Sequence, residues 1–180
     1  MIEFQDISFS YPEGTEGGLK NINLTIPDGQ CVLFCGQSGC GKTTLTRLVN
    51  GLIPQFFDGE LTGKVLFNGE NLFNVPMYQI AKKVGSVFQN PRTQFFNVDT
   101  DSEIVFGLEN EAVPQEELKS SVMETAKSLH IESLLGRNIF ALSGGEKQKI
   151  AFASVYAMNP EVYLLDEPSS NLDMATIKEL

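Results

Sequence analysis

One glycine-rich segment constrains this chain more than any other part of its sequence. Residues 36–43 read GQSGCGKT and match the pattern G-x-x-x-x-G-K-[ST]. The apolar run Cys31–Cys35 precedes the pattern as a predicted buried strand, and a helix is predicted between Gly41 and Gly51. Between a strand and a helix, the backbone amides of such a loop surround a polyphosphate. The segment therefore predicts a phosphate-binding loop, with a plain glycine-rich turn as the alternative.

The side chains of this loop have separate predicted roles. Lys42 is expected to neutralise the terminal phosphates and to act in catalysis, and the Thr43 hydroxyl is expected to bind Mg²⁺. The residues of the loop predicted to contact the bound cofactor are Gly36, Ser38, Gly39, Cys40, Gly41, Lys42, Thr43 and Thr44.

A second predicted buried strand, Val162–Leu165, ends at two adjacent carboxylates, Asp166 and Glu167. Parallel α/β sheets place their ligands at the carboxyl ends of their strands. We therefore expect Asp166 to bind Mg²⁺ and Glu167 to polarise an attacking water molecule. Two acids after an apolar run are by themselves an ordinary loop start, but beside a phosphate loop they predict a hydrolytic site.

The composition argues against several other classes of protein. The chain has 180 residues and a net charge of −10, which does not suit a broad basic surface for nucleic acid. No apolar run approaches the roughly 18 residues of a membrane span, and the N-terminus lacks signal-peptide features, so we expect a cytosolic domain. The three cysteines form no metal-binding pattern, and Cys31 and Cys35 are predicted to be reduced core residues.

The negative charge is concentrated in one segment. Residues 99–124 contain eight carboxylates and one lysine. Runs of charge usually solvate a surface, so the segment predicts a solvated acidic face. A docking face for a basic partner is the alternative.

The remaining pattern predicts an α/β core with a helical insertion. A helix is expected after Pro114, where apolar residues recur at intervals of four, four and three. A second helix should begin at Ser143, because Ser143 and Glu146 have capping-box spacing, and should end before Asn159. The other predicted β segments are residues 2–9, 22–26, 61–69 and 84–88.

The segment Leu142–Gln148 reads LSGGEKQ and lies between the two motifs. Together the three resemble the motifs of ATP-binding-cassette (ABC) ATPases. The resemblance implies an α/β fold: a P-loop NTPase core with an N-terminal antiparallel β-subdomain and an inserted α-helical subdomain, truncated at the C-terminus. The whole chain, 1–180, would form one ABC ATPase domain, with the β-subdomain and nucleotide-binding core at 1–89 and 158–180 and the helical subdomain at 90–157.

The same resemblance implies further residues of an ATP and Mg²⁺ site. Tyr11 resembles the aromatic residue that stacks on adenine, and a strand-end aromatic is its alternative. Gln89 resembles the Q-loop glutamine, which contacts Mg²⁺ and acts in catalysis, and a surface amide is its alternative. Asp173 resembles the D-loop aspartate. The signature residues that would complete the ATP site of an opposite subunit, in a head-to-tail dimer, are Ser143, Gly144 and Gly145.

Two further segments, residues 87–96 and 103–110, resemble the cobalt-type, energy-coupling-factor (ECF) ATPases of micronutrient importers. This resemblance implies an ATPase at the cytoplasmic face of the membrane that couples ATP hydrolysis to uptake of a metal ion or vitamin. Its implied partners are a second ATPase subunit, a transmembrane coupling subunit and a substrate-binding membrane subunit, and no nucleic acid. The rival is a soluble ABC ATPase of DNA repair or chromosome maintenance.

One departure from the family pattern concerns histidine. ABC ATPases have a switch histidine beyond the D-loop, but the one histidine of this sequence is His130, in the predicted helix after Pro114. The sequence also stops at Leu180, within a predicted helix. We interpret it as a C-terminally truncated chain, and a nucleotide-binding module without turnover is the second alternative for these 180 residues.

Overall fold

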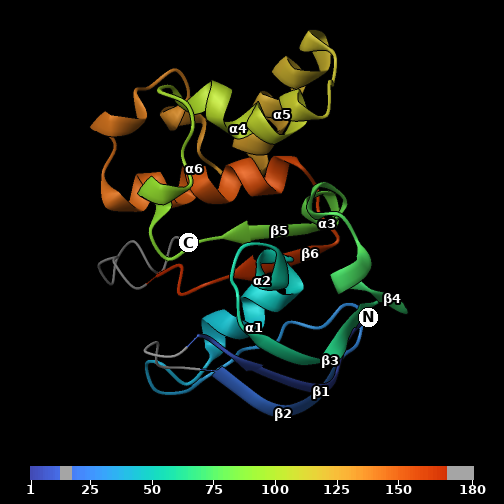
Figure 1. Ribbon diagram of the computed structural model, residues 1–180. Helices are drawn as coiled ribbons and strands as arrows, with labels where there is room; N and C mark the ends of the chain where they lie inside the picture. Colours follow the sequence, from blue (N-terminus) through green and yellow to red (C-terminus); the bar gives the residue numbers. More distant parts are fainter. Residues whose placement is uncertain (13–17, 170–180) are drawn as a thin grey trace. The chain divides into compact units, whose positions relative to one another are not determined.

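The computed structural model describes residues 1–12 and 18–169. Contacts divide the chain into two compact units, Met1–Val84 and Gly85–Leu180, and each unit is described by itself (Figure 1). The first unit contains β1 (Ile2–Ser10), β2 (Gly18–Ile26), α1 (Lys42–Val49), α2 (Leu52–Gln55), β3 (Glu60–Phe67), β4 (Glu70–Asn71) and α3 (Met77–Lys83).

The four strands of the first unit form one antiparallel sheet in the order β2-β1-β3-β4. Apolar and polar residues alternate along β1, but the pairing of β1 with both neighbours shifts near Asp6. Opposite this irregularity, Gly63 of β3 has a φ of +82°, and a Cβ there would lie 2.5 Å from the carbonyl oxygens of Gln5 and Asp6. Glycine is therefore the residue that lets the strands approach here.

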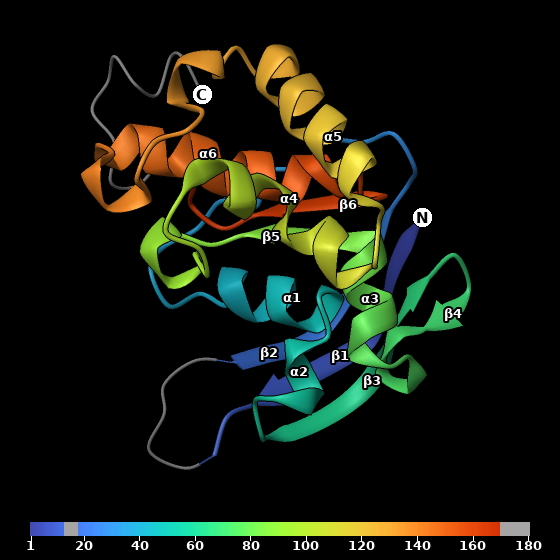
Figure 2. The ribbon, with the colours of Figure 1, turned by 90° about the horizontal axis from the view of Figure 1, so that it is seen from above.

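The core of the first unit lies between this sheet and its helices. Figures 1 and 2 show α1 and α2 on the same side of the sheet. Apolar side chains of one sheet face pack toward these helices, because burying them removes apolar area from water. The core residues from the strands and helices include Ile2, Phe4, Ile7, Phe9, Leu48, Val49, Ile53, Val65, Phe67 and Ile80.

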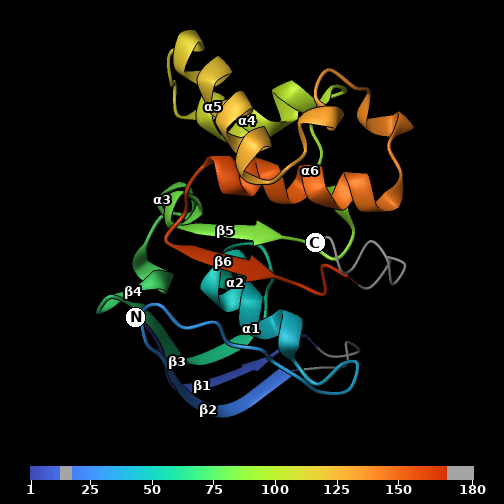
Figure 3. The same ribbon diagram turned by 180° about the vertical axis from the view of Figure 1, so that it is seen from behind.

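The second unit combines a small sheet with a helical layer. Figure 3 shows β5 and β6 running in the same direction, with α6 over them and α4 and α5 on the far side of α6. The core of the helices comprises Ile104, Val105, Val122, Ala126, Ile131, Leu134, Leu142, Ile150 and Ala153. The elements are β5 (Val84–Val87), which begins at the boundary, α4 (Thr100–Asn110), α5 (Gln115–Ser128), α6 (Gly144–Ala157) and β6 (Val162–Leu165).

Most predicted elements are confirmed. The helix after Pro114 is α5, and the helix predicted to begin at Ser143 is α6, which has Ser143 as its N-cap. The predicted β segment 61–69 corresponds to β3, which pairs antiparallel with β4. The predicted layout, which groups residues 158–180 with 1–89, stays a prediction. None of the helices in the described part of the chain combines the length and apolar character that a membrane crossing requires.

The prediction of a buried strand before the phosphate loop is wrong for this structure. Residues 31–35 have no regular secondary structure, and the side chain of Leu33 is 83% exposed. Cys31 and Cys35 are exposed free thiols rather than core residues. An apolar run becomes a buried strand only where neighbouring strands pair with it and helices cover it. Among the described strands of the first unit, none pairs with this run.

The structure differs from the prediction in three more places. The strand Val162–Leu165 is confirmed as β6, but Leu165 is 47% exposed, so the strand is only half buried. Within the acidic segment, Glu103 is buried, and its Oε2 accepts hydrogen bonds from the backbone N–H groups of Phe96 and Asn97 at 3.0 and 2.8 Å. His130 is exposed and lies just beyond the end of α5.

Candidate nucleotide-binding and hydrolysis site

The predicted phosphate loop wraps around the ammonium group of Lys42. Its Nζ donates hydrogen bonds to the carbonyl oxygens of Gly36 and Gln37, each at 3.1 Å, and lies 3.9 Å from the Cys40 sulfur. The backbone N–H of Cys40 donates to the Gln37 carbonyl at 3.3 Å, which closes a turn inside the loop. The loop thus holds a cation at the position where the sequence predicts the terminal phosphates.

The helix that follows the loop begins without a side-chain cap. Gly41 is the N-cap of α1, its φ is +98°, and no acidic residue lies in the first turn. A Cβ on Gly41 would lie 2.7 Å from a methyl group of Leu19 and 3.0 Å from the Gly18 carbonyl oxygen. The first amides of a helix have no partner within the helix, and they favour an anion. The start of α1 therefore suits a phosphate group.

Tyr11, the predicted adenine-stacking residue, belongs to the same unit as the loop. Its hydroxyl accepts a hydrogen bond from Arg47 Nη1 at 2.8 Å and lies 3.3 Å from the hydroxyl of Thr44, which is buried. The Phe9 ring packs edge-to-face with the Tyr11 ring, at a centroid distance of 4.7 Å. Arg47 was not among the residues predicted from sequence, because nothing in its spacing marks it.

The second unit brings together three predicted residues at the end of β6. The backbone N–H of Asp166 donates to the carbonyl oxygen of Val87, the last residue of β5, at 3.0 Å. Gln89 Nε2 donates to Glu167 Oε2 at 3.0 Å. Glu167 has a φ of +47°, in the left-handed region that residues other than glycine rarely adopt. Such strained positions concentrate at functional sites.

The signature segment begins α6 with a complete capping box. Ser143 Oγ accepts from the Glu146 backbone N–H at 3.3 Å, and Glu146 Oε2 accepts from the Ser143 backbone N–H at 2.7 Å. Arg137 Nη1 donates to Glu146 Oε1 at 2.8 Å. The backbone hydrogen bond from Ser143, followed by the Arg137 guanidinium, lowers the pKa of Glu146 to about 2. Like Arg47, Arg137 contacts a predicted site segment, and no sequence pattern marked it.

The donor types of the predicted Mg²⁺ ligands fit that ion. Thr43, Gln89 and Asp166 offer hydroxyl, amide and carboxylate oxygens, which Mg²⁺ prefers. Thr43 lies in the first unit, and Gln89 and Asp166 lie in the second. In the described part of the chain, no three His, Cys, Asp or Glu side chains gather into a metal-binding cluster. Asp173 lies outside the described residues.

Comparison with known proteins gives one family. The family model described as ABC transporter matches residues 19–170. A putative ABC transporter ATP-binding protein of Treponema denticola is 61% identical over 180 residues, which are 100% of this chain and 37% of that protein. The energy-coupling factor transporter ATP-binding protein EcfA1 of Ligilactobacillus salivarius is 40% identical over 173 residues, which are 96% of this chain and 60% of that protein.

A solved structure gives the same answer for the fold. The structure of CbiO1 from Clostridium perfringens, described as part of the ABC transporter complex CbiONQ, superposes with a TM-score of 0.85 at 30% identity. The match covers 99% of this chain and 69% of CbiO1. The α/β fold is therefore that of the ABC ATPases, as the sequence resemblance implied. From its phosphate loop, its signature helix and these relatives, the chain belongs to the ABC transporter family, with relatives among the ECF-type ATP-binding proteins.

Proposed function

We propose that the protein is the ATP-binding and ATP-hydrolysing subunit of an ECF-type importer for a metal ion or vitamin. The chain spans 37% of the length of the Treponema denticola relative, so the activity of the whole protein is inferred from the site residues of these 180 residues. The hydrogen bond between Gln89 and Glu167 is the main support for hydrolysis. Binding alone needs the phosphate loop, whereas a carboxylate held beside a strand-end aspartate suits activation of water.

Each residue of the proposed site has a separate task. Lys42 would exchange its hydrogen bonds to the loop carbonyls for bonds to the terminal phosphates. Thr43 and Asp166 would bind Mg²⁺, which supplies charge neutralisation at the transferred phosphoryl group. Gln89 already donates its amide N–H to Glu167, so its amide oxygen is the atom that would bind Mg²⁺. Glu167 would accept a proton from the attacking water.

The signature helix would act on the ATP of a second subunit. Ser143 uses its oxygen as an acceptor in the capping box, which leaves the hydroxyl proton to donate to a phosphate. The backbone N–H groups of Gly144 and Gly145 lie in the first turn of α6, where a helix favours an anion. We propose that these groups complete the partner's ATP site, together with Asp173.

An apolar surface of the second unit supports a membrane partner. An aromatic groove of about 320 Å³ is lined by Arg92, Phe95, Ile139, Phe140 and Lys147. Phe140 is 73% exposed, and Phe96, which follows the lining residue Phe95 in the chain, is 74% exposed and stacked on Phe106. Exposed aromatic patches mark interaction sites. We propose that the transmembrane coupling subunit docks at this groove, placing the protein at the cytoplasmic face of the membrane beside a substrate-binding membrane subunit.

Glu167→Gln tests the proposed hydrolysis in the full-length protein. It should leave MgATP affinity unchanged and slow ATP hydrolysis by roughly 10² to 10⁴. Glu161→Gln is the matched control, because Glu161 is exposed and precedes the other end of β6; its turnover should match the unmodified protein. Normal turnover with Glu167→Gln would exclude Glu167 as the base, and loss of MgATP binding would make it a metal ligand or structural residue.

A further inference from the structure

Arg47 is the cation of α1 that the proposed chemistry does not use. It lies in the last turn of the helix, and it is the donor to the Tyr11 hydroxyl. We propose that Arg47 is a positioning residue for the nucleotide base: it holds the Tyr11 ring in the orientation in which an aromatic base stacks on it. The proposal rests on the base-stacking role of Tyr11 in the proposed function.

The guanidinium of Arg47 is held from two sides. Its Cζ lies 4.1 Å from the centroid of the Phe57 ring, and its Nη1 donates to the Tyr11 hydroxyl at 2.8 Å. A guanidinium over an aromatic face is attracted by the ring, and its planar group presents donors in fixed directions. Phe57 therefore fixes the direction from which Arg47 approaches Tyr11.

The hydroxyl of Tyr11 links the ring to the phosphate-binding segment. Because Arg47 donates to this hydroxyl, the hydroxyl proton is available for Thr44 Oγ1, which lies 3.3 Å away. Thr44 is 5% exposed and follows the predicted Mg²⁺ ligand Thr43. The chain of contacts thus runs from Phe57 through Arg47 and Tyr11 to α1.

The position of Tyr11 in the chain explains why it needs such a support. The pairing of β1 with its two neighbours ends at Ser10, so the residue after it is not held by the sheet. The rings of Phe9 and Phe57 lie nearly perpendicular to the Tyr11 ring, at interplanar angles of 84° and 87°. Neither ring stacks in parallel on Tyr11. A base gains stacking energy only from a ring held at a fixed position, so a lost support should weaken base binding.

This role predicts an effect that depends on the base and not on the phosphates. We would measure the affinity of the full-length protein for MgATP and for magnesium tripolyphosphate, which has no base. Arg47→Met and Tyr11→Phe each remove the hydrogen bond between the two side chains while keeping much of their apolar bulk. Each should weaken MgATP binding by about 3- to 10-fold, the range for one net hydrogen bond, and leave tripolyphosphate binding unchanged.

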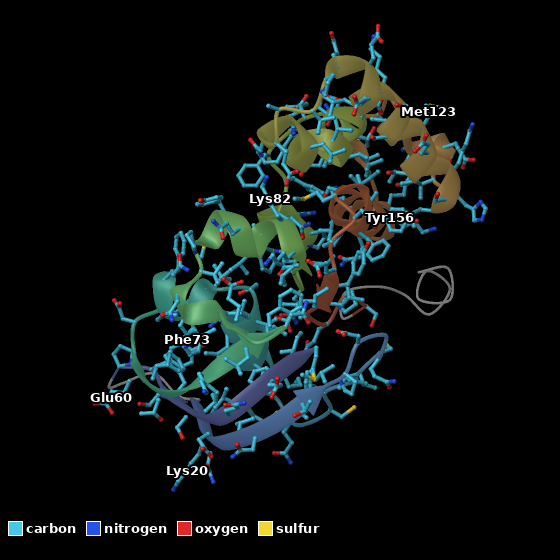
Figure 4. All side chains as sticks on the ribbon, turned by 90° about the vertical axis from the view of Figure 1, so that its right-hand side faces the viewer. Lys20, Glu60, Phe73, Lys82, Met123 and Tyr156 are labelled. Atoms are coloured by element: carbon cyan, nitrogen blue, oxygen red, sulfur yellow. The ribbon has the colours of Figure 1, made fainter. Side chains whose placement is uncertain are left out.

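A double variant and a control sharpen the test. Arg47→Met combined with Tyr11→Phe should be no weaker than the weaker single variant, because both remove the same interaction. Lys20→Met is the charge-matched control, because Lys20 is exposed and extends from the outer side of β2 (Figure 4). It should bind both ligands like the unmodified protein.

The possible failures point to different parts of the argument. If Arg47→Met weakened the binding of both ligands equally, Arg47 would act on the phosphates or on α1, and the positioning role would be wrong. Additive losses in the double variant would also contradict it. Tyr11→Ala separates the two proposals: an unchanged preference for MgATP over tripolyphosphate would refute base stacking by Tyr11 itself. A preference lost in Tyr11→Ala but kept in Arg47→Met would refute only the role of Arg47.

Discussion

The two helices that begin at glycine-rich motifs start in opposite ways. At α1, the N-cap Gly41 has no side chain, the first turn contains no acid, and the residue after the cap is Lys42. At α6, Ser143 caps the helix, and the Glu146 carboxylate in the first turn accepts a hydrogen bond from the Ser143 backbone N–H. Of these two helix starts, only the second has a side-chain cap.

This difference indicates what each motif requires from a ligand. The loop before α1 presents a cation, and the helix start has no side-chain cap and no acidic residue in its first turn, so an anion adds favourable charge there. The start of α6 already has a side-chain cap and a carboxylate of its own in the first turn. We therefore expect the first motif to bind nucleotide by itself, and the second to contribute to a site only when another surface brings the phosphate.

The largest predicted effect removes the cation from the first motif. Lys42→Ala should reduce ATP hydrolysis of the full-length protein to background and weaken MgATP binding, because in the proposed site Lys42 would supply the charge-assisted donor to the terminal phosphates. A coupled-enzyme assay would measure the rate of hydrolysis, and calorimetry would measure the affinity for MgATP. Lys64→Ala, at an exposed position of β3, is the control and should have no effect. Undiminished turnover in Lys42→Ala would show that the loop assignment is wrong.

An intermediate effect compares the two glycine positions directly. Gly41→Ala should lower the free energy of unfolding by about 1 to 3 kcal/mol, because its φ is +98° and the new methyl group meets Leu19 and Gly18. Gly144→Ala should instead raise it by about 0.5 to 1 kcal/mol, since a Cβ there meets nothing within 4 Å. Urea unfolding of the two variants would measure the change in the free energy of unfolding and its sign in each. Equal effects would remove the distinction between the helix starts.

The smallest effect is a pH dependence at the second motif. The pKa of Glu146 is lowered from 4.5 to about 2, so its charged form stabilises the folded protein above pH 4.5. That contribution should decline as the pH falls from about 4.5 to about 2. Glu146→Gln should cost about 0.5 to 1 kcal/mol at pH 7, as expected for a partly solvated cap, and less at pH 3. Unfolding curves at both pH values would measure it, and a pH-independent loss would exclude a role for the charge.

The parts of the fold that sequence predicted well are those determined by neighbouring residues. The capping box at Ser143 and the helix after Pro114 depend on spacing within a few residues, and both were confirmed. The run Cys31–Cys35 was predicted wrongly, because an apolar run does not specify which strands will pair with it. Arg47 and Arg137 were missed for the same reason: their partners lie 36 and 9 residues away in the chain.

The hydrogen bonds of Lys42 to Gly36 and Gln37 have a further consequence for how a ligand enters the loop. The two carbonyl oxygens act as neutral substitutes for phosphate oxygens, and they keep the ammonium group in place before any nucleotide arrives. A phosphate then replaces these carbonyls in an exchange, and the rotational freedom of a long side chain is not lost at that step. The loop would therefore discriminate by charge, since an anionic oxygen competes for the ammonium better than a neutral carbonyl and a neutral ligand gains little from the exchange.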